Sequence, residues 1–209
     1  MNGLFAWPLR MTDLSASGFI ELVAGRRGHF AMESGYHSAL WLDLDALFAA
    51  PAPVQPFVSA LANLLRAYRV QVVCGPLLGG AFLAQKIAEA LGAEFWYTEP
   101  VQRAETTGLY QAQYRLPSAF AGRVARPRVA LVDDVMSAGS SLRATDAALR
   151  ERGADVVAVG ALLTLGSVGV RYFADRNVPV ESVVRAELEM WTPDDCPHCA
   201  AGMPLERVG

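Results

Sequence analysis

The chain has 209 residues, of which 53% are hydrophobic and 19% are charged, and its formal net charge at pH 7 is −3. This length fits one domain of ordinary size. The apolar content excludes an intrinsically disordered chain, and the negative charge provides no basic surface for nucleic acid.

The sequence shows no targeting or membrane-spanning segment. The N-terminus, MNGLFAWPLRMTDLS, lacks a charged start followed by an apolar run and a cleavage site. The longest uncharged apolar stretch, 156–170, is shorter than the roughly 18–20 residues that span a bilayer. Three cysteines, two of them near the C-terminus, do not form a disulfide framework. We therefore expect a soluble, cytoplasmic protein with no membrane partner.

The N-terminal third predicts two helices with a break between them. Helical patterns of apolar residues occur at 15–24 and at 56–69. Pro51, Pro53 and Pro56 favour an interruption of regular structure before the second helix.

From residue 70 onward, short apolar runs alternate with longer helical patterns. This alternation predicts an α/β fold, in which a mostly parallel sheet is flanked by helices. Right-handed crossovers place the C-terminal ends of such strands on one edge of the sheet. Gly92 and Gly153 are expected to end the two helices. The predicted strands are 70–74, 94–97 and 129–132, with a fourth strand and its exit loop at 155–165, and the predicted helices are 79–91 and 140–152.

The most informative segment is 129–141, which reads VALVDDVMSAGSS. Its apolar start predicts a buried strand, Asp133 and Asp134 follow, and a loop of small residues then opens a helix. Such a loop lets backbone N–H groups approach a phosphate at a helix N-terminus. Carboxylates repel a phosphate, so they are expected to bind ribose hydroxyls or Mg²⁺. The alternative is a buried strand that ends in a solvated acid pair before an N-capped helix.

This segment resembles the phosphoribosyl-pyrophosphate (PRPP) signature of type I phosphoribosyltransferases. The sequence GPLLGG at 75–80 resembles the pyrophosphate-binding loop of that family, and SGYHS at 34–38 resembles an element of orotate phosphoribosyltransferases. The ending WTPDDCPHC at 191–199 resembles that of some orotate-type members. The resemblance implies the type I phosphoribosyltransferase fold, with a small hood built from the N-terminal and C-terminal segments. We expect one domain over 1–209, with a cap segment at about 1–69, a PRPP-binding core at 70–170 and a C-terminal extension at 171–209.

The resemblance also implies a reaction in which PRPP and a nitrogenous base form a nucleotide and pyrophosphate, with Mg²⁺ as cofactor. Asp133 and Asp134 would hold the ribose hydroxyls, directly or through Mg²⁺, and Arg103 matches a catalytic lysine of the orotate enzymes by position. The segment 99–117 would cover the site and, in a homodimer, reach the neighbouring subunit. The implied 5-phosphate site is Ser137, Ala138, Gly139, Ser140 and Ser141; the pyrophosphate site is Leu77, Leu78, Gly79 and Gly80; the base site is Tyr36, His37 and Ser137.

The sequence departs from the orotate-type pattern at several charged positions. Glu33 stands where those enzymes have a lysine, and Glu99 and Pro100 stand where they have cations. The strand end LTLG at 163–166 lacks the arginine that those enzymes have near this point for the orotate carboxylate. Lys86 is the only lysine beside 17 arginines, and a general preference for arginine explains Arg103 but not the lost charges.

Two functions therefore stay open. One is an active phosphoribosyltransferase acting on orotate or another heterocycle. The other is a PRPP- or nucleotide-binding sensor or regulatory protein with little turnover on the same fold, which the missing cations favour.

The pair Cys196 and Cys199, in the sequence CPHC, is half of a zinc ligand set. The only further ligand nearby in the sequence is His198. A structural zinc is therefore an alternative to a C-terminal segment whose two cysteines are reduced and bind no metal. Phe30 and Trp41 are candidates for stacking on a base, although core packing is the simpler expectation.

Overall fold

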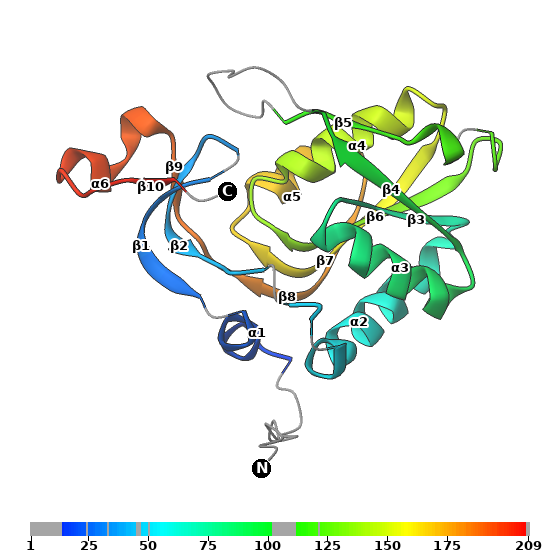
Figure 1. The fold of residues 1–209 in the computed structure, drawn as a ribbon, viewed down its shortest axis with the longest axis horizontal. Helices are drawn as coiled ribbons and strands as arrows, with labels where there is room; N and C mark the ends of the chain where they lie inside the picture. Colours follow the sequence, from blue (N-terminus) through cyan, green and yellow to red (C-terminus); the bar gives the residue numbers. More distant parts are fainter. Residues whose placement is uncertain are drawn as a thin grey trace, which may run out of the picture.

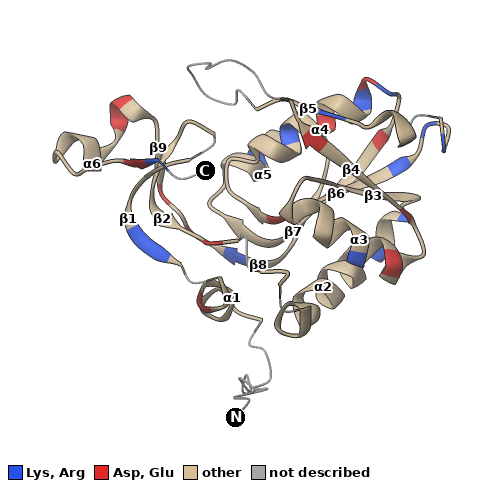
Figure 2. Cartoon of the chain, viewed as in Figure 1, with Lys and Arg blue, Asp and Glu red and all other residues tan. Residues whose placement is uncertain are grey.

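The computed structural model describes residues 14–23, 25–32, 34–44, 47–49, 51–101, 112–120 and 122–207. They form a six-stranded sheet with helices on both faces and a smaller four-stranded sheet beside it (Figure 1). No helix in these ranges is both long enough and apolar enough to cross a membrane. Lysine and arginine residues are scattered over both sheets and several helices rather than gathered on one face (Figure 2).

The main sheet has the strand order β5-β4-β3-β6-β7-β8. Its strands are parallel except β5, which pairs antiparallel with β4. The bounds are β3 Val72–Pro76, β4 Glu94–Pro100, β5 Tyr114–Arg115, β6 Arg128–Met136, β7 Asp155–Leu165 and β8 Val180–Ala186.

Helices cover both faces of this sheet, because successive side chains of its strands are apolar and point to opposite faces. Val73 and Ala130 point into a cluster with α2 and α3, whereas their neighbours Val72 and Val129 point into a second cluster with α4 and α5. The helix α1 packs on the first cluster, where Phe19 meets Phe57 of α2 edge to face. The bounds are α1 Ala16–Leu22, α2 Pro51–Leu65, α3 Gly79–Leu91, α4 Ser140–Arg150 and α5 Val168–Ala174, with short 3₁₀ turns at η1 Arg66–Tyr68 and η2 Ser118–Phe120.

The smaller sheet, which we call the hood, joins two distant parts of the chain. Its strand order is β10-β1-β2-β9, so the β1–β2 hairpin lies between two C-terminal strands (Figure 1). The strand β1 runs parallel to β10, and β2 runs antiparallel to both β1 and β9. The bounds are β1 Arg26–Ala31, β2 His37–Trp41, β9 Met190–Trp191 and β10 Glu206–Arg207, with η3 Pro193–Asp195 and α6 Pro197–Ala200 between the last two strands.

The predicted elements of the core agree closely with the structure. The helix predicted at 79–91 has the observed bounds, and the segment 155–165, predicted as a strand with its exit loop, is a strand over its whole length. Gly92 ends α3 in the left-handed conformation, with a φ of 66° that favours glycine. The strand predicted at 129–132 continues through both aspartates to Met136 as β6. The mostly parallel sheet flanked by helices is thus confirmed.

The predicted break at the prolines is wrong, because α2 begins at Pro51 and contains all three of them. Pro51 and Pro53 lie in the first turn, where backbone N–H groups have no intrahelical partner to lose. Pro56 lies deeper and does remove one hydrogen bond. The apolar face of α2 offsets that loss, since Val54, Phe57 and other residues on it are buried.

A single hydrogen bond links η1 to β8, and it makes the stability of the fold sensitive to alkaline pH. The Tyr68 hydroxyl donates to Glu181 Oε1 at 2.5 Å, and this bond, helped by burial, raises the pKa of Tyr68 to about 12. In the unfolded chain a tyrosine ionises near pH 10. The stabilisation is therefore fully present below about pH 10 and is lost as the pH rises through about 12.

We expect Tyr68→Phe to lower the free energy of unfolding by about 1 kcal/mol at neutral pH, through loss of this hydrogen bond. The free energy of unfolding of the variant should also fall less at alkaline pH, because position 68 no longer carries a hydroxyl that ionises. Urea unfolding of both proteins at about pH 8 and about pH 11 measures the two effects. An equal loss of stability in both proteins over that interval would contradict the assignment to Tyr68.

Candidate active site

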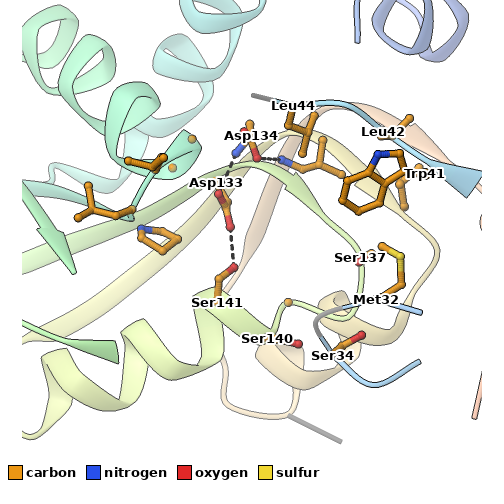
Figure 3. A pocket seen from close by; sticks show the side chains of 18 of the residues that line it. Met32, Ser34, Trp41, Leu42, Leu44, Asp133, Asp134, Ser137, Ser140 and Ser141 are labelled. Atoms are coloured by element: carbon orange, nitrogen blue, oxygen red, sulfur yellow. Dashed lines mark hydrogen bonds between the residues drawn. The ribbon is translucent and has the colours of Figure 1, made fainter. Parts of the chain in front are cut away.

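A pocket of about 600 Å³ lies between the hood side of the molecule and the C-terminal ends of the parallel strands (Figure 3). This is the edge at which open α/β sheets bind ligands. One wall comes from Met32, Ser34 and residues 40–44, and the opposite wall comes from the loops after β3, β6 and β7. The pocket-lining residues of the first wall are Met32, Ser34, Leu40, Trp41, Leu42, Asp43 and Leu44. Those of the opposite wall are Pro76, Leu77, Leu78, Gly79, Gly80, Asp133, Asp134, Val135, Ser137, Gly139, Ser140, Ser141 and Leu165, and Pro100 and Tyr114 also line the pocket.

The acid pair lies at the floor of this pocket, where β6 is still paired with β7. The side chains of Asp133 and Asp134 are buried, at 7% and 5% exposure. Asp133 Oδ2 accepts a hydrogen bond from the Ser141 hydroxyl at 2.7 Å, and Asp134 Oδ1 accepts one from the Val135 N–H at 2.7 Å (Figure 3). These bonds orient both carboxylates before any ligand binds.

The glycine loop at the start of α3 packs directly against these carboxylates. A Cβ added at Gly79 would lie 2.0 Å from Asp134 Oδ2, and one at Gly80 would lie 2.7 Å from Asp133 Oδ1. The peptide between Leu77 and Leu78 is cis, and the Leu77 N–H donates to the Thr98 carbonyl at 2.8 Å. Glycine at 79 and 80 therefore lets the N-terminus of α3, with its unsatisfied N–H groups, approach the acid pair.

The small-residue loop leads into α4 on the other side of the acid pair. Gly139 precedes the helix with a φ of 73°, a conformation that favours glycine. Ser137, Gly139, Ser140 and Ser141 line the pocket, whereas Ala138 is buried beneath it. The loop thus presents hydroxyl groups and a helix N-terminus to the pocket, which suits an anion.

Two hydroxyl groups in the pocket wall indicate a polar ligand. In the part of the chain that the structure describes, the buried Oγ atoms of Ser34 and Ser140 have no hydrogen-bond partner. Both residues line the pocket. Because buried polar atoms in native proteins nearly always have a partner, these two are suited to bind a ligand.

The remaining wall is apolar. Met32, Leu40 and Trp41 face the cavity from the hood side, and Leu165 faces it from the end of β7. Trp41 is thus placed to contact a ligand, while Phe30 is only 2% exposed and belongs to the core. No lysine or arginine is found among the described residues that line the pocket.

The structure separates some residues that the sequence grouped together. Ser137 lines the pocket, whereas the predicted base-site residues Tyr36 and His37 do not, and His37 lies instead beside His29 and the two C-terminal cysteines. Arg103 and Glu33 lie outside the described residues. Of the apolar wall only Trp41 was a candidate from the sequence; Met32, Leu40 and Leu165 were missed because they come from separate segments and form no motif. Ser34 could have been found within its serine-glycine motif.

The position of Glu99 explains part of the departure from the orotate-type pattern. Glu99 and Pro100 are the last residues of β4 and pair with β5. The Glu99 carboxylate contacts the Arg115 guanidinium at 3.4 Å on the surface, while Pro100 lines the pocket. The negative charge of Glu99 is therefore balanced by the positive charge of Arg115 on the neighbouring strand β5.

Comparison with known proteins supports this geometry. The family described as phosphoribosyl transferase domain matches residues 43–188. An orotate phosphoribosyltransferase of Thermotoga petrophila is 33% identical over 184 residues, which cover 87% of this chain and 90% of that protein. The crystal structure of orotate phosphoribosyltransferase from Aeropyrum pernix has a TM-score of 0.62 and 24% identity, covering 79% of this chain and 89% of that one.

The fold itself is shared with enzymes that use other bases. Adenine phosphoribosyltransferase from Thermoanaerobacter pseudethanolicus has a TM-score of 0.59 at 18% identity, covering 70% of this chain and 88% of that one. The fold alone therefore does not select the base. The family match spans the sheet and both loops that meet at the acid pair, and the sequence similarity extends beyond them over most of the chain. The chain accordingly belongs to the phosphoribosyltransferase family, and its sequence is most like those of the orotate enzymes.

Proposed function

We propose that this transferase moves ribose 5-phosphate from PRPP to an orotate-type pyrimidine or a related base, with release of pyrophosphate. The observation that supports it most directly is the convergence of three elements on one pocket. These are the acid pair at the end of β6, the glycine loop before α3 and the small-residue loop before α4. A diol, a pyrophosphate and a phosphate are the three groups that such elements would bind together.

In this proposal each element holds one part of PRPP. The loop Ser137 to Ser141 binds the 5-phosphate through hydroxyls and backbone N–H groups. Asp133 and Asp134 hold the ribose hydroxyls, and the backbone of residues 77–80 faces the pyrophosphate. Positioning and charge stabilisation of an oxocarbenium-like transition state then supply most of the rate, with little covalent chemistry for the protein to do.

The residues present fit a magnesium ion. Mg²⁺ prefers carboxylate oxygens and substrate phosphates, and the two carboxylates line the pocket where the pyrophosphate is proposed to lie. When bound, the ion would neutralise charge on the leaving pyrophosphate. This chain's own contribution is to hold the two carboxylates in fixed orientation through Ser141 and Val135.

The base would lie against the apolar wall. Met32, Leu40 and Trp41 offer surfaces for a planar ring, and the Ser34 hydroxyl offers a polar contact. The wall at Leu165 is apolar near the point where orotate enzymes have an arginine. An orotate carboxylate would then be bound by groups other than an arginine at this strand end, and a less acidic base would also fit.

The alternative is a PRPP-binding protein with weak turnover. The charge at Glu99 and the proline at 100 favour it, because both stand where orotate enzymes have cations. Incubation with PRPP, Mg²⁺ and a panel of pyrimidine and purine bases, with pyrophosphate measured, separates the two. Release with one base supports the transferase; tight PRPP binding with no release from any base would leave the weakly active protein as the function.

Arg103 is proposed as the cation that acts on the leaving pyrophosphate in turnover. Its position matches the catalytic lysine of the orotate enzymes, and the segment 99–117 is proposed to cover the site, reaching across a homodimer. We expect Arg103→Ala to lower kcat by about 10²-fold while nucleotide affinity changes by less than about threefold.

Steady-state kinetics and nucleotide titration of the same samples test this role. Arg123→Ala, an exposed arginine outside this segment that pairs with Glu94, is the matched control and should keep kcat within about twofold. Equal losses of turnover and affinity in Arg103→Ala would contradict a role confined to the transition state.

A further inference from the structure

Four side chains that the proposed reaction does not use meet in the hood. His29 lies on β1 and His37 on β2, while Cys196 immediately precedes the short helix α6 and Cys199 lies within it. Their ligand atoms all lie within 4.8 Å of one another. His29, His37 and Cys196 are buried, and none of the four lines the substrate pocket.

The distances between these atoms match the edges of a metal-centred tetrahedron. His29 Nε2 lies 3.1 Å from His37 Nδ1, 3.4 Å from Cys196 Sγ and 3.7 Å from Cys199 Sγ. Cys199 Sγ lies 3.3 Å from His37 Nδ1. Zinc bonds of about 2.0–2.1 Å to nitrogen and about 2.3 Å to sulfur give tetrahedral edges of about 3.3–3.8 Å. These four distances fall in or next to that interval, and the other two edges are no longer than 4.8 Å.

Hydrogen bonds alone explain this convergence poorly. His29 Nδ1 lies 3.0 Å from the Met203 carbonyl, which can only accept, so Nδ1 carries a proton, and in the neutral ring Nε2 has one lone pair. That lone pair faces three neighbours at once. One lone pair cannot accept hydrogen bonds from all three, whereas a central ion would be shared by all four ligand atoms.

The hydrogen bond from His29 Nδ1 to the Met203 carbonyl is also typical of histidines that bind a metal through their other ring nitrogen. A ligating histidine usually donates its second ring N–H to a carbonyl or carboxylate, which fixes the ring and the tautomer. The thiols of Cys196 and Cys199 are free rather than joined in a disulfide, so both sulfurs are available as ligands. Two thiolates and two imidazoles form a closed ligand set typical of structural zinc.

We propose that His29, His37, Cys196 and Cys199 bind a structural zinc ion that fastens the C-terminal segment to the β1–β2 hairpin. Binding would release the two thiol protons to solvent and involves no oxidation or reduction. The ion would close the hood across the residues that separate β9 from β10. His198, which the sequence suggested as a ligand, packs beside the site against Trp191 instead.

The site would also support the substrate pocket. His29 and His37 stand on either side of the turn between β1 and β2, and this turn places Met32 and Ser34 in the pocket wall. A metal bound to both histidines would hold the two ends of that turn together. Loss of the ion should therefore loosen one wall of the pocket without touching the acid pair.

Metal analysis of the full-length protein tests the proposal. The protein is purified without chelators, equilibrated with a slight excess of ZnSO₄ and passed over a desalting column. We expect close to one zinc per chain in the eluate. Replacement by Co²⁺ should give the intense visible bands of a tetrahedral ion and a thiolate charge-transfer band. Stripping the metal should lower Tm by roughly 5 °C or more.

Variants locate the ligands. Cys199→Ser and His37→Gln should lose at least about nine-tenths of the bound zinc, since each removes one ligand of a closed set. His198→Gln, in the same short helix but outside the cluster, is the matched control and should keep its zinc. The metal and cobalt measurements on the unaltered protein remain decisive if a ligand variant fails to fold.

Three results would overturn the proposal. The first is an unaltered protein that retains almost no zinc after equilibration. The second is a cobalt spectrum of a six-coordinate ion without thiolate bands. The third is a loss of zinc in His198→Gln as large as that in Cys199→Ser.

Discussion

Replacing Asp133 and Asp134 together by asparagine is expected to lower kcat/KM for PRPP by about 10³-fold or more. Asparagine keeps the size and one acceptor oxygen, so Ser141 can still donate to position 133. The substitution removes both negative charges that are proposed to hold the ribose hydroxyls and Mg²⁺. The buried position of the pair makes the loss of charge costly for the transition state, because solvent screens it little.

Pyrophosphate release and PRPP titration, each at a fixed Mg²⁺ concentration, measure this effect. Asp155→Asn is the matched control, since Asp155 is exposed at the opposite end of the neighbouring strand β7. The control should stay within about twofold of the unaltered protein. Unchanged PRPP binding in the double variant would show that the ribose site lies elsewhere.

Substituting Gly79 by alanine is expected to lower kcat/KM by about 10²-fold. The new Cβ would lie 2.0 Å from Asp134 Oδ2, so either the carboxylate or the start of α3 must move. Both movements disturb the approach of the glycine loop to the acid pair. The same overlap should lower the free energy of unfolding by about 1–3 kcal/mol.

Inhibition by pyrophosphate and urea unfolding measure the two consequences separately. Leu78→Ala, at the preceding position of the loop, is the control. The Leu78 side chain is 65% exposed, and its removal leaves the backbone in place. It should change pyrophosphate inhibition by less than about threefold. An alanine variant at 79 with normal inhibition would mean that the loop does not need this close approach.

The parts of the fold that could be predicted are those whose signal is local. The helix at 79–91 has a regular apolar period, so its bounds were predicted correctly. The apolar residues of 155–165 indicated a strand, but not that it extends through the expected exit loop. The prolines of α2 misled the prediction because burial of one helix face outweighs a lost hydrogen bond. The hood was expected only from the family resemblance, because β1 pairs with β10 from the other end of the sequence and no local pattern indicates such a pairing.

The residues of the candidate site also differ in whether the sequence could predict them. The acid pair and its serine loop are contiguous in sequence, so residues 133–141 could be identified together. The apolar wall and the histidine–cysteine cluster are each assembled from segments far apart in the chain. His29 and His37 have no spacing to Cys196 that a motif could express, and only the strand pairing of the hood brings them together.

The pairing of β1 with β10 also determines the order in which the pocket can form during synthesis. The hairpin that supplies Met32 and Ser34 emerges from the ribosome long before β9 and β10 exist to pair with it. Strands β3 to β8 of the main sheet are translated in the meantime, and pairings between residues far apart in the sequence form late in folding. The outer wall of the pocket is thus completed only after residues 190–207 have been translated, so a nascent chain would have its acid pair in place before it could enclose a substrate.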